Sequence, residues 1–338
     1  MEHLLVTGGA GFVGSNFVRH VMETTPYRVT ILDKLTYAAS RASLSGLEPE
    51  RCRLVVGDVA DAEVVHSLVA DVDAIVHFAA ESHNDNSLHE PDPFVRTNIL
   101  GTYTVLEAAR AYGTRLHHVS TDEVFGDLPL GSRARFSELS PFNPSSPYSG
   151  TKAGADLLVR AWSRSFDLRA TISNSCNIYG PFQHVEKFIP RQITNILRGT
   201  RPKVYGDGLN VREWLHVEDH SRAVLTILER GTIGETYLVG TGVERENISV
   251  LRMILKLMDR ADDYFDQVAD RPGHDARYAI DSSKLRSTLQ WTPQHDDLEA
   301  GLSSTIDWYR RNESWWGPGK DAVEAAYGER ENTRSDGS

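Results

Sequence analysis

Cysteine is scarce in this sequence, and long apolar runs and clusters of basic residues are missing. The two cysteines, Cys52 and Cys176, are too few for a disulfide framework and lack the CxxC spacing of a metal or redox site. We interpret them as small buried hydrophobic residues and predict no metal site. No apolar run approaches the roughly 20 residues of a membrane span. The net charge of −11, without a Lys/Arg run, argues against nucleic acid as the main partner.

What is present is typical of a globular protein. The hydrophobic fraction is 40% and the charged fraction 25%, and 338 residues exceed the usual size of one domain. We therefore expect a large domain with a smaller companion, or one extended α/β unit. The chain enters an apolar strand pattern at Leu4 without the basic and apolar stretches of a secretory signal, which favours the cytoplasm.

The first half of the chain alternates short apolar runs with helical patterns. We expect strands over 3–7, 28–33, 52–57, 73–79 and 115–120, and helices over 12–24, 60–70, 91–112 and 148–166. This alternation predicts an α/β fold with a Rossmann-type, doubly wound parallel sheet. We assign residues 1–180 to that domain, to which later segments can return, and residues 181–320 mainly to a smaller C-terminal lobe. Residues 328–338 are polar and lack apolar anchors, which predicts disorder.

A glycine-rich loop, TGGAGFVG at 7–14, lies between the first strand and the first helix. Gly8, Gly11 and Gly14 permit a tight turn, a close approach of backbone N–H groups to a pyrophosphate, and close packing of the helix on the strand. Asp33 ends the second strand, where an acidic side chain binds ribose hydroxyls. Asp33 would repel a 2′-phosphate, which favours NAD over NADP, although Lys34 softens that preference.

Further residues at strand ends fit the same dinucleotide. Asp58 follows the third strand and is placed either to accept from an adenine amino group or to cap the next helix. Ala79 and Ala80 put small side chains where a cofactor would lie against the sheet, and Thr97 begins the helical region beyond.

A second group of residues suits the oxidation of an alcohol. Thr121 follows an apolar strand, at the end where open α/β sheets place ligands. Tyr148 and Lys152 are four residues apart and so share one helix face. An ammonium beside a phenol lowers the pKa of the phenol, which makes it a usable base. Chance YxxxK matches are common, so the prediction of an alcohol-oxidising site also depends on the glycine loop and Thr121.

The chain resembles the dTDP-glucose 4,6-dehydratases, members of the extended short-chain dehydrogenase/reductase family, over about residues 3–316. The most specific segments are DKLTYA at 33–38, AAESH at 79–83, STDEVFGD at 120–127, EKFIP at 186–190, VYGDG at 204–208, VREW at 211–214 and DRPGHD at 270–275. The resemblance implies a hydro-lyase that retains one NAD and converts dTDP-glucose to dTDP-4-keto-6-deoxyglucose and water.

The adjacent carboxyl groups of Asp122 and Glu123 distinguish this reaction from epimerisation. Removing water requires one group to take the C5 proton and another to protonate the departing C6 hydroxyl, and carboxyls with different pKa values can do both. The resemblance makes Asp122 the acid and Glu123 the base. It implies that Tyr148 removes the O4 proton while hydride passes from C4 to NAD, with Thr121 polarising the oxygen. After elimination, hydride returns to C6 and a proton to C5.

The resemblance also assigns binding residues. It places at the cofactor Gly8, Gly11, Phe12, Val13, Gly14, Asp33, Lys34, Leu35, Thr36, Asp58, Val59, Ala79, Ala80, Ser82, Thr97, Tyr148 and Lys152. It places at the substrate His83, Thr121, Asn177, Lys187, Phe188, Lys203, Val204, Tyr205, Arg212, Asn247, Arg271 and His274. Arg212 and Arg271 suit a diphosphate, which an arginine can grip with two hydrogen bonds, although single arginines more often form surface ion pairs.

The chain departs from the family pattern at several positions. Asn84 and Asn86 stand in a motif that commonly reads HVDRS, Ile178 replaces an asparagine associated with the cofactor, and Phe125 replaces a tyrosine. Family members pair two long helices of each subunit in a homodimer, and 97–112 and 150–166 are apolar enough to serve, although core packing explains them equally well.

Other functions remain open at this level. A UDP-glucose 4,6-dehydratase or a sugar-nucleotide 4-epimerase would share most of these residues. A non-catalytic NAD-binding scaffold would have no use for Thr121, Asp122, Glu123, Tyr148 and Lys152 together.

Overall fold

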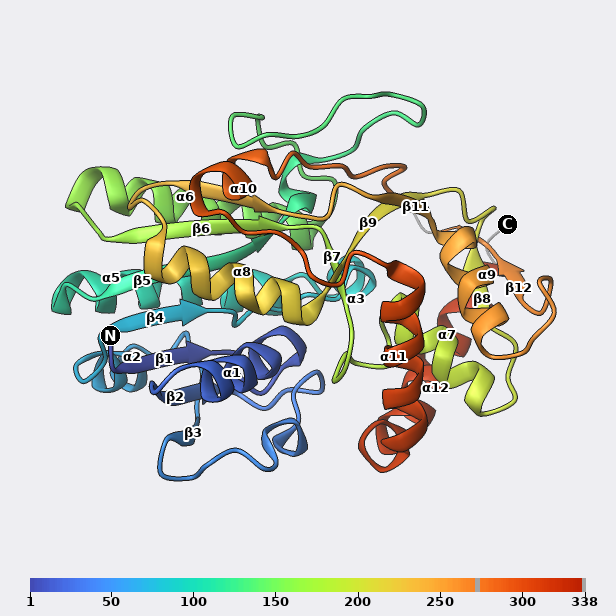
Figure 1. Cartoon of the computed structure of the whole chain (residues 1–338), viewed down its shortest axis with the longest axis horizontal. Coiled ribbons are helices and arrows are strands. Elements are labelled where there is room, and N and C mark those ends of the chain that lie inside the picture. Colours follow the sequence, from blue (N-terminus) through green and yellow to red (C-terminus); the bar gives the residue numbers. More distant parts are fainter. Residues whose placement is uncertain (271–273, 336–338) are drawn as a thin grey trace.

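A parallel seven-stranded sheet forms the centre of the molecule, in a computed structural model that describes residues 1–270 and 274–335 (Figure 1). Its order is β10-β6-β5-β4-β1-β2-β3. The strands are β1 (His3–Thr7), β2 (Arg28–Asp33), β3 (Cys52–Val56), β4 (Ala74–His77), β5 (Arg115–Thr121), β6 (Ala170–Ser175) and β10 (Thr236–Val239). The order reverses between β1 and β4, and open α/β sheets bind ligands at the carboxyl ends of strands beside such a reversal. The predicted doubly wound fold is confirmed.

Helices cover both faces of this sheet. One face packs against α1 (Phe12–Thr24) and α8 (Val217–Arg230), and the other against α2 (Ala62–Val69), α5 (Thr102–Tyr112) and α6 (Pro147–Phe166). Leu4 of β1 is buried with Phe17 of α1, whereas the adjacent Leu5 is buried with Val105 of α5. Successive side chains of a strand point to opposite faces, so each strand supplies both cores, which explains its nearly continuous apolar sequence.

The helix predicted over 91–112 is interrupted. It consists of α4 (Asp92–Phe94), the π-helical segment η2 (Val95–Gly101) and α5. Asn98 of η2 is buried, accepts from the backbone N of Glu81 at 2.9 Å and donates to Thr151 Oγ1 at 2.9 Å. The irregular turn thus coincides with polar contacts to distant segments, which hydrophobic periodicity does not reveal.

The smaller lobe lies beyond the carboxyl ends of the strands (Figure 1). It contains α7 (Phe188–Leu197), α9 (Asn247–Leu257), α11 (Leu298–Arg311) and two small sheets, β11 (Glu244–Glu246)-β9 (Val211–His216)-β7 (Asn177–Tyr179) and β12 (Asp266–Val268)-β8 (Lys203–Tyr205). Ile193, Leu251 and Leu302 meet in its core. The later segments α8 and β10 lie with the large sheet.

Four short elements and the long C-terminal helix α12 complete the described chain. They are η1 (Arg41–Leu44), α3 (Asn84–His89), η3 (Asp122–Phe125), α10 (Ser283–Leu289) and α12 (Glu313–Ser335). Because α12 continues to Ser335, residues 328–335 are helical, in contrast to the predicted disorder, and 336–338 lie outside the described residues. Tyr327, which is buried and bonds the carbonyl of Glu186 at 3.2 Å, anchors the helix just before this segment. Within the described residues, no helix combines the length and apolar character that crossing a membrane requires.

The core of the smaller lobe provides a test of packing. Leu251 is fully buried, so Leu251→Ala should lower the free energy of unfolding by about 2–5 kcal/mol through lost apolar burial and a residual cavity. Leu139 is 95% exposed, so Leu139→Ala should change the free energy of unfolding by less than about 0.5 kcal/mol. Urea unfolding of both variants measures the difference, and equal effects would contradict this packing.

Candidate active site

The glycine loop after β1 passes close to the chain that follows β4. Gly8 has a φ of +69°, and a Cβ on it would lie 2.7 Å from the backbone N of Ala79. A Cβ on Gly14 would lie 2.2 Å from the carbonyl oxygen of Gly8. Gly11 is the N-cap of α1 and supplies no side-chain cap. The first turn of α1 is therefore compact and suited to an anion such as a pyrophosphate.

Asp33 lies at the end of β2 beside this loop. Its carboxylate accepts from the backbone N of Ala10 at 2.9 Å and from that of Leu35 at 2.8 Å. Burial raises the pKa of Asp33, whereas these hydrogen bonds oppose the rise. Leu35 has a φ of +55°, so the chain turns sharply there.

Asp58 follows β3 and pairs with Lys34, whose Nζ lies 2.8 Å from Asp58 Oδ2. Burial raises the pKa of this carboxyl, but the pair with Lys34 and the hydrogen bond from the Ala60 backbone N lower it overall. The cation that was expected to soften the preference for NAD is thus partly neutralised by Asp58.

Nearly all the predicted cofactor residues line one pocket at the carboxyl edge of the sheet. They are Gly8, Gly11, Phe12, Val13, Gly14, Asp33, Lys34, Thr36, Asp58, Val59, Ala79, Ala80, Ser82, Thr97, Tyr148 and Lys152. Leu35 is the exception, and its contribution is the backbone N–H given to Asp33. Gly57, Glu81, Ser120 and Gln183 also line the pocket and were not predicted.

Tyr148 and Lys152 enter this pocket from the first turns of α6. Ser146 and Ser149 form a capping box that begins this helix. Lys152 Nζ donates to the carbonyl of Val119 at 2.8 Å, and burial lowers the pKa of Lys152 to about 8. The expected lowering of the Tyr148 pKa is not found. Burial and the nearby charge of Glu123 raise it, while a hydrogen bond with Thr121 opposes the rise.

A buried polar cluster stands behind these two residues. Asp156, one further turn along α6, lies 3.2 Å from His118 Nε2 and accepts from Asn174 Nδ2 at 2.8 Å. Asn174 Nδ2 also donates to the carbonyl of Thr121 at 3.0 Å. The cluster therefore ties α6 to the ends of β5 and β6, and so fixes Lys152 relative to Thr121.

Thr121, Asp122 and Glu123 lie where β5 passes into η3. Thr121 Oγ1 accepts from the backbone N of Glu123 at 3.3 Å. Asp122 is 2% exposed and its Oδ2 has no hydrogen-bond partner among the described residues. Burial, and then the charges of Glu123 and Glu213, raise the pKa of Asp122 well above its ordinary value. Asp122 is thus disposed to be a neutral acid.

A second pocket adjoins the first and is lined by most of the predicted substrate residues. They are His83, Asn177, Lys187, Phe188, Lys203, Val204, Tyr205, Arg212, Asn247 and His274. Thr121 lines only the first pocket, and Arg271 lies outside the described residues. The two pockets share Ser82, Glu123, Asn177, Glu186 and Lys187, so Glu123 stands at their junction.

Arg212 is buried among backbone carbonyls. Its Nη1 donates to Val211 O at 2.8 Å and its Nη2 to Asp275 O at 2.8 Å, while its guanidinium lies 4.3 Å from the Tyr278 ring centroid. Protein groups thus occupy part of the fork that was predicted for a diphosphate. Lys187 likewise donates to the carbonyl of Ser82 at 2.7 Å.

Several residues at the second pocket were not among the predicted substrate residues. Tyr327 of α12 reaches His83, with its hydroxyl 3.2 Å from His83 Nε2, and Glu186 lies 3.7 Å from the same nitrogen. Trp214 and Tyr278 complete the wall. The EKFIP segment signalled Glu186, whereas nothing in the local sequence signalled Tyr327.

The structure shows what surrounds three of the residues that depart from the family pattern. Asn84 Nδ2 donates to Glu123 Oε2 at 3.1 Å, so an unusual residue of the histidine motif contacts the predicted base. Ile178 lines the first pocket. Phe125 is buried in an aromatic cluster, with ring centroids 5.3 Å from Phe136 and 5.4 Å from Phe142, where a hydroxyl is not required.

Comparisons with known proteins bear on this geometry. The family model described as GDP-mannose 4,6 dehydratase matches residues 5–304. The chain belongs to this family. It is 63% identical to a dTDP-glucose 4,6-dehydratase of Mycobacterium tuberculosis (strain CDC 1551 / Oshkosh) over 328 residues, which cover 97% of this chain and 99% of that relative. The resemblance seen in the sequence is thereby confirmed.

Solved structures agree with that relationship. The dTDP-glucose 4,6-dehydratase DesIV of Streptomyces venezuelae, crystallised with NAD and TYD bound, superposes with a TM-score of 0.90 at 44% identity, covering 94% of this chain and all of that chain (100%). A UDP-glucose 4-epimerase of Thermotoga maritima with UDP-glucose gives a TM-score of 0.85 at 26% identity, covering 91% of this chain and 99% of that chain. Epimerases are therefore more distant relatives than dehydratases.

The raised pKa of Asp122 makes a prediction about stability. When a carboxyl has a higher pKa in the folded than in the unfolded chain, the free energy of unfolding falls as pH rises from the unfolded-state pKa to the folded-state pKa. Asp122→Asn removes this titration, so the variant should gain stability relative to the parent chain as pH rises from 5 to 8. Denaturant unfolding at both pH values measures the change. A constant difference would show that Asp122 titrates normally.

Proposed function

We propose that this chain is an NAD-dependent dTDP-glucose 4,6-dehydratase, a hydro-lyase that forms dTDP-4-keto-6-deoxyglucose and water. The observation that carries the proposal is the pair of carboxyls at the pocket junction. Asp122 is buried and held neutral, and Glu123 faces both the cofactor pocket and the adjoining pocket. An epimerase has no need of such a pair. The 63% identity to a dTDP-glucose 4,6-dehydratase supports the same reaction.

The first pocket fits NAD. Gly8 and Gly14 keep the loop free of side chains beside the first turn of α1, where a pyrophosphate binds, and Asp33 is placed for the ribose hydroxyls. Bound in this pocket, NAD would supply positive charge and the capacity to take a hydride from the sugar and to give it back. Tyr148 and Lys152 line the same pocket, so a sugar that reacts with the cofactor would lie near them.

The oxidation half of the reaction needs a proton acceptor for the sugar 4-hydroxyl. Tyr148 accepts this proton. Thr121, which is hydrogen-bonded to Tyr148, also holds the sugar O4. Burial and the nearby charge of Glu123 make the Tyr148 phenolate unfavourable, so a positive environment is required for Tyr148 to act as a base. Lys152, fixed by the Val119 carbonyl, contributes part of that charge.

The elimination half depends on two carboxyls in opposite protonation states. Glu123 removes the C5 proton and gives a proton back to C5 when hydride reaches C6. The hydrogen bond from Asn84 orients its carboxylate. Asp122, neutral because of burial, delivers its proton to the leaving C6 hydroxyl. Asp122 then becomes a buried carboxylate near Glu213, an unfavourable state that favours its return to the protonated form.

The second pocket suits the nucleotide part of the substrate. It holds aromatic side chains, Phe188, Trp214 and Tyr205, together with cationic Lys203. Trp214 Nε1 and Asn247 Oδ1 are buried without hydrogen-bond partners among the described residues, so a donor and an acceptor stand ready for a polar ligand. The similarity to dTDP-glucose 4,6-dehydratases favours a thymidine nucleotide.

We further propose that the chain works as a homodimer in the cytoplasm, where nucleotide sugars and NAD are available. Tyr103 of α5 and Leu157 and Phe166 of α6 are each more than two-fifths exposed, and α5 packs beside α6. An exposed apolar face on two adjacent helices favours pairing with a second copy. Light scattering of the purified chain measures its mass in solution.

The substrate assignment is tested by offering dTDP-glucose and UDP-glucose to the purified chain in parallel. We expect a 4-keto product, detected by its absorbance in alkali, and a higher kcat/KM with dTDP-glucose. Preference for UDP-glucose with the same chromophore would make the chain a UDP-glucose 4,6-dehydratase. A C4 epimer without chromophore would make it an epimerase, and no turnover of either would favour a scaffold.

The assigned roles are tested by Glu123→Gln and Tyr148→Phe. Each variant loses a proton-transfer group, so kcat should fall by about 10²–10⁴-fold with dTDP-glucose. Glu63→Gln and Tyr112→Phe change the same residue types at exposed positions and should leave kcat unchanged. Unchanged turnover in Glu123→Gln or Tyr148→Phe would exclude this mechanism.

A further inference from the structure

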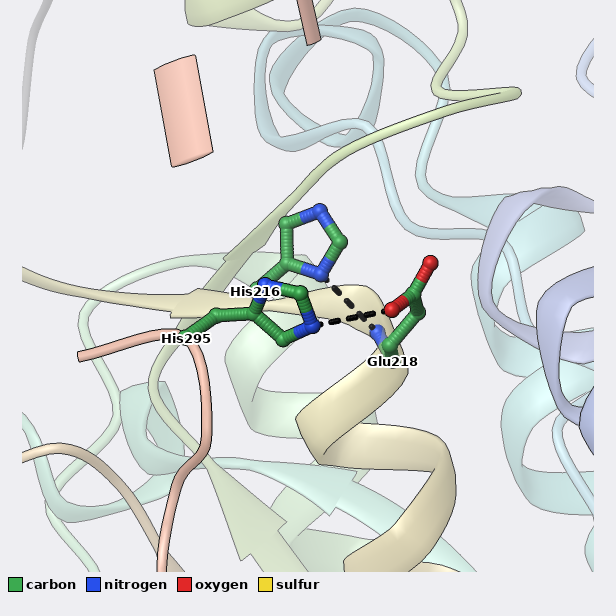
Figure 2. Close-up of side chains that lie close together, drawn as sticks. All are labelled: His216, Glu218 and His295. Atoms are coloured by element: carbon green, nitrogen blue, oxygen red, sulfur yellow. Dashed lines mark hydrogen bonds and ion pairs between the residues drawn. The ribbon is translucent and has the colours of Figure 1, made fainter. Parts of the chain in front are cut away.

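A cluster of two histidines and one glutamate, none of which lines either pocket, lies where β9 ends and α8 begins (Figure 2). His216 ends β9, Glu218 lies in the first turn of α8, and His295 belongs to the segment that leads into α11. One potential ligand atom from each residue lies within 4.8 Å of the others. We propose that this cluster binds a divalent first-row transition metal ion such as Zn²⁺ or Co²⁺, a function beyond the proposed dehydration.

The donor atoms are of the appropriate kind. Figure 2 shows the rings of His216 and His295 side by side, each with a nitrogen directed towards Glu218. His295 Nε2 lies 2.9 Å from Glu218 Oε2. The ring centroids of the histidines are 4.2 Å apart. Two imidazole nitrogens and one carboxylate oxygen suit zinc and its neighbours rather than Mg²⁺ or Ca²⁺, which prefer oxygen, and leave a position open for water.

The buried member of the cluster has an unprotonated ring nitrogen, which is directed towards the backbone N–H of Glu218. His216 is 3% exposed, and its Nδ1 accepts from the backbone N of Glu218 at 3.4 Å. A backbone N–H can only donate, so Nδ1 is the unprotonated nitrogen of this ring. The long hydrogen bond is weak, and a metal ion could replace it at small cost.

A buried carboxylate holds the third ligand in place. Asp219 is fully buried and accepts from the backbone N of Gln294 at 2.8 Å and from that of His295 at 2.8 Å. Arg222 Nη1 donates to the same carboxylate at 2.9 Å. The segment bearing His295 is therefore fixed to α8 before any ion binds, which reduces the ordering cost of binding.

A bound ion would link two parts of the molecule. It would join the segment before α11, a helix of the smaller lobe, to the start of α8, a helix that packs on the large sheet. Arg212, near the beginning of β9, lines the second pocket, whereas His216 at its end belongs to the cluster. Because the ion binds the folded chain, it would raise the melting temperature.

The test uses the full-length chain without a histidine tag, freed of metal by chelation and desalting. Titration with Co²⁺ should give visible d–d absorption that saturates at one equivalent per chain, and added Zn²⁺ should displace the Co²⁺. His295→Gln and Glu218→Gln alter exposed or half-exposed side chains, so the fold should tolerate both changes. Each should weaken Co²⁺ binding at least tenfold and remove the rise in melting temperature.

His89→Gln, which alters an exposed histidine outside the cluster, is the matched control and should bind Co²⁺ like the parent chain. Absence of saturable Co²⁺ binding, or equal affinity in the parent chain and both cluster variants, would overturn the proposal. Binding is read without substrate or NAD, so failure here is distinguishable from failure of the proposed dehydratase activity.

Discussion

The parallel pairing of β5 with its neighbours is the constraint on which the candidate site depends. Thr121 lies opposite Ser175 of β6, and His77 of β4 lies opposite His118, so these strands end at the same edge of the sheet, where β5 and β6 extend beyond β4. β1 ends at the same edge, because Thr7 pairs with His77. The glycine loop, the cofactor wall and the carboxyl pair follow directly after these strands. A register shift in β5 would move Asp122 and Glu123 away from Tyr148 and turn alternate side chains to the wrong face.

The centre of the sheet also carries more polar side chains than apolar packing requires. His77, His117 and His118 are fully or almost fully buried, and burial lowers the pKa of each. His117 bonds two hydroxyls of β6, at 2.9 and 3.0 Å, and His118 contacts Asp156. These contacts offset the cost of burial, and the His118 contact acts on the site, since Asp156 connects α6 to β5 through Asn174.

The sequence predicts what is encoded locally. Strand and helix patterns locate β1, β2, β5, α1 and α6 almost to the residue, and glycine spacing locates the loop, because backbone conformation at Gly8 and Gly14 restricts the residue type directly. The π-helical η2 and the position of Tyr327 are set by contacts between distant segments, which no local pattern contains. The altered pKa of Tyr148 escaped prediction for a similar reason. The YxxxK spacing places Lys152 on the same helix face as Tyr148. The burial and the Glu123 charge that raise the pKa of Tyr148 arise only in the assembled site.

The adjacent carboxyls illustrate how a fold assigns different roles to neighbouring residues. Asp122 and Glu123 are consecutive, yet the turn of η3 directs them to different surroundings. Asp122 lies in the interior near Glu213, and Glu123 reaches the junction of the pockets, where Asn84 donates to it. Two like charges close together in a poorly solvated region favour the protonation of one of them. The more buried carboxyl takes the proton, so the acid and the base follow from the geometry of a single turn.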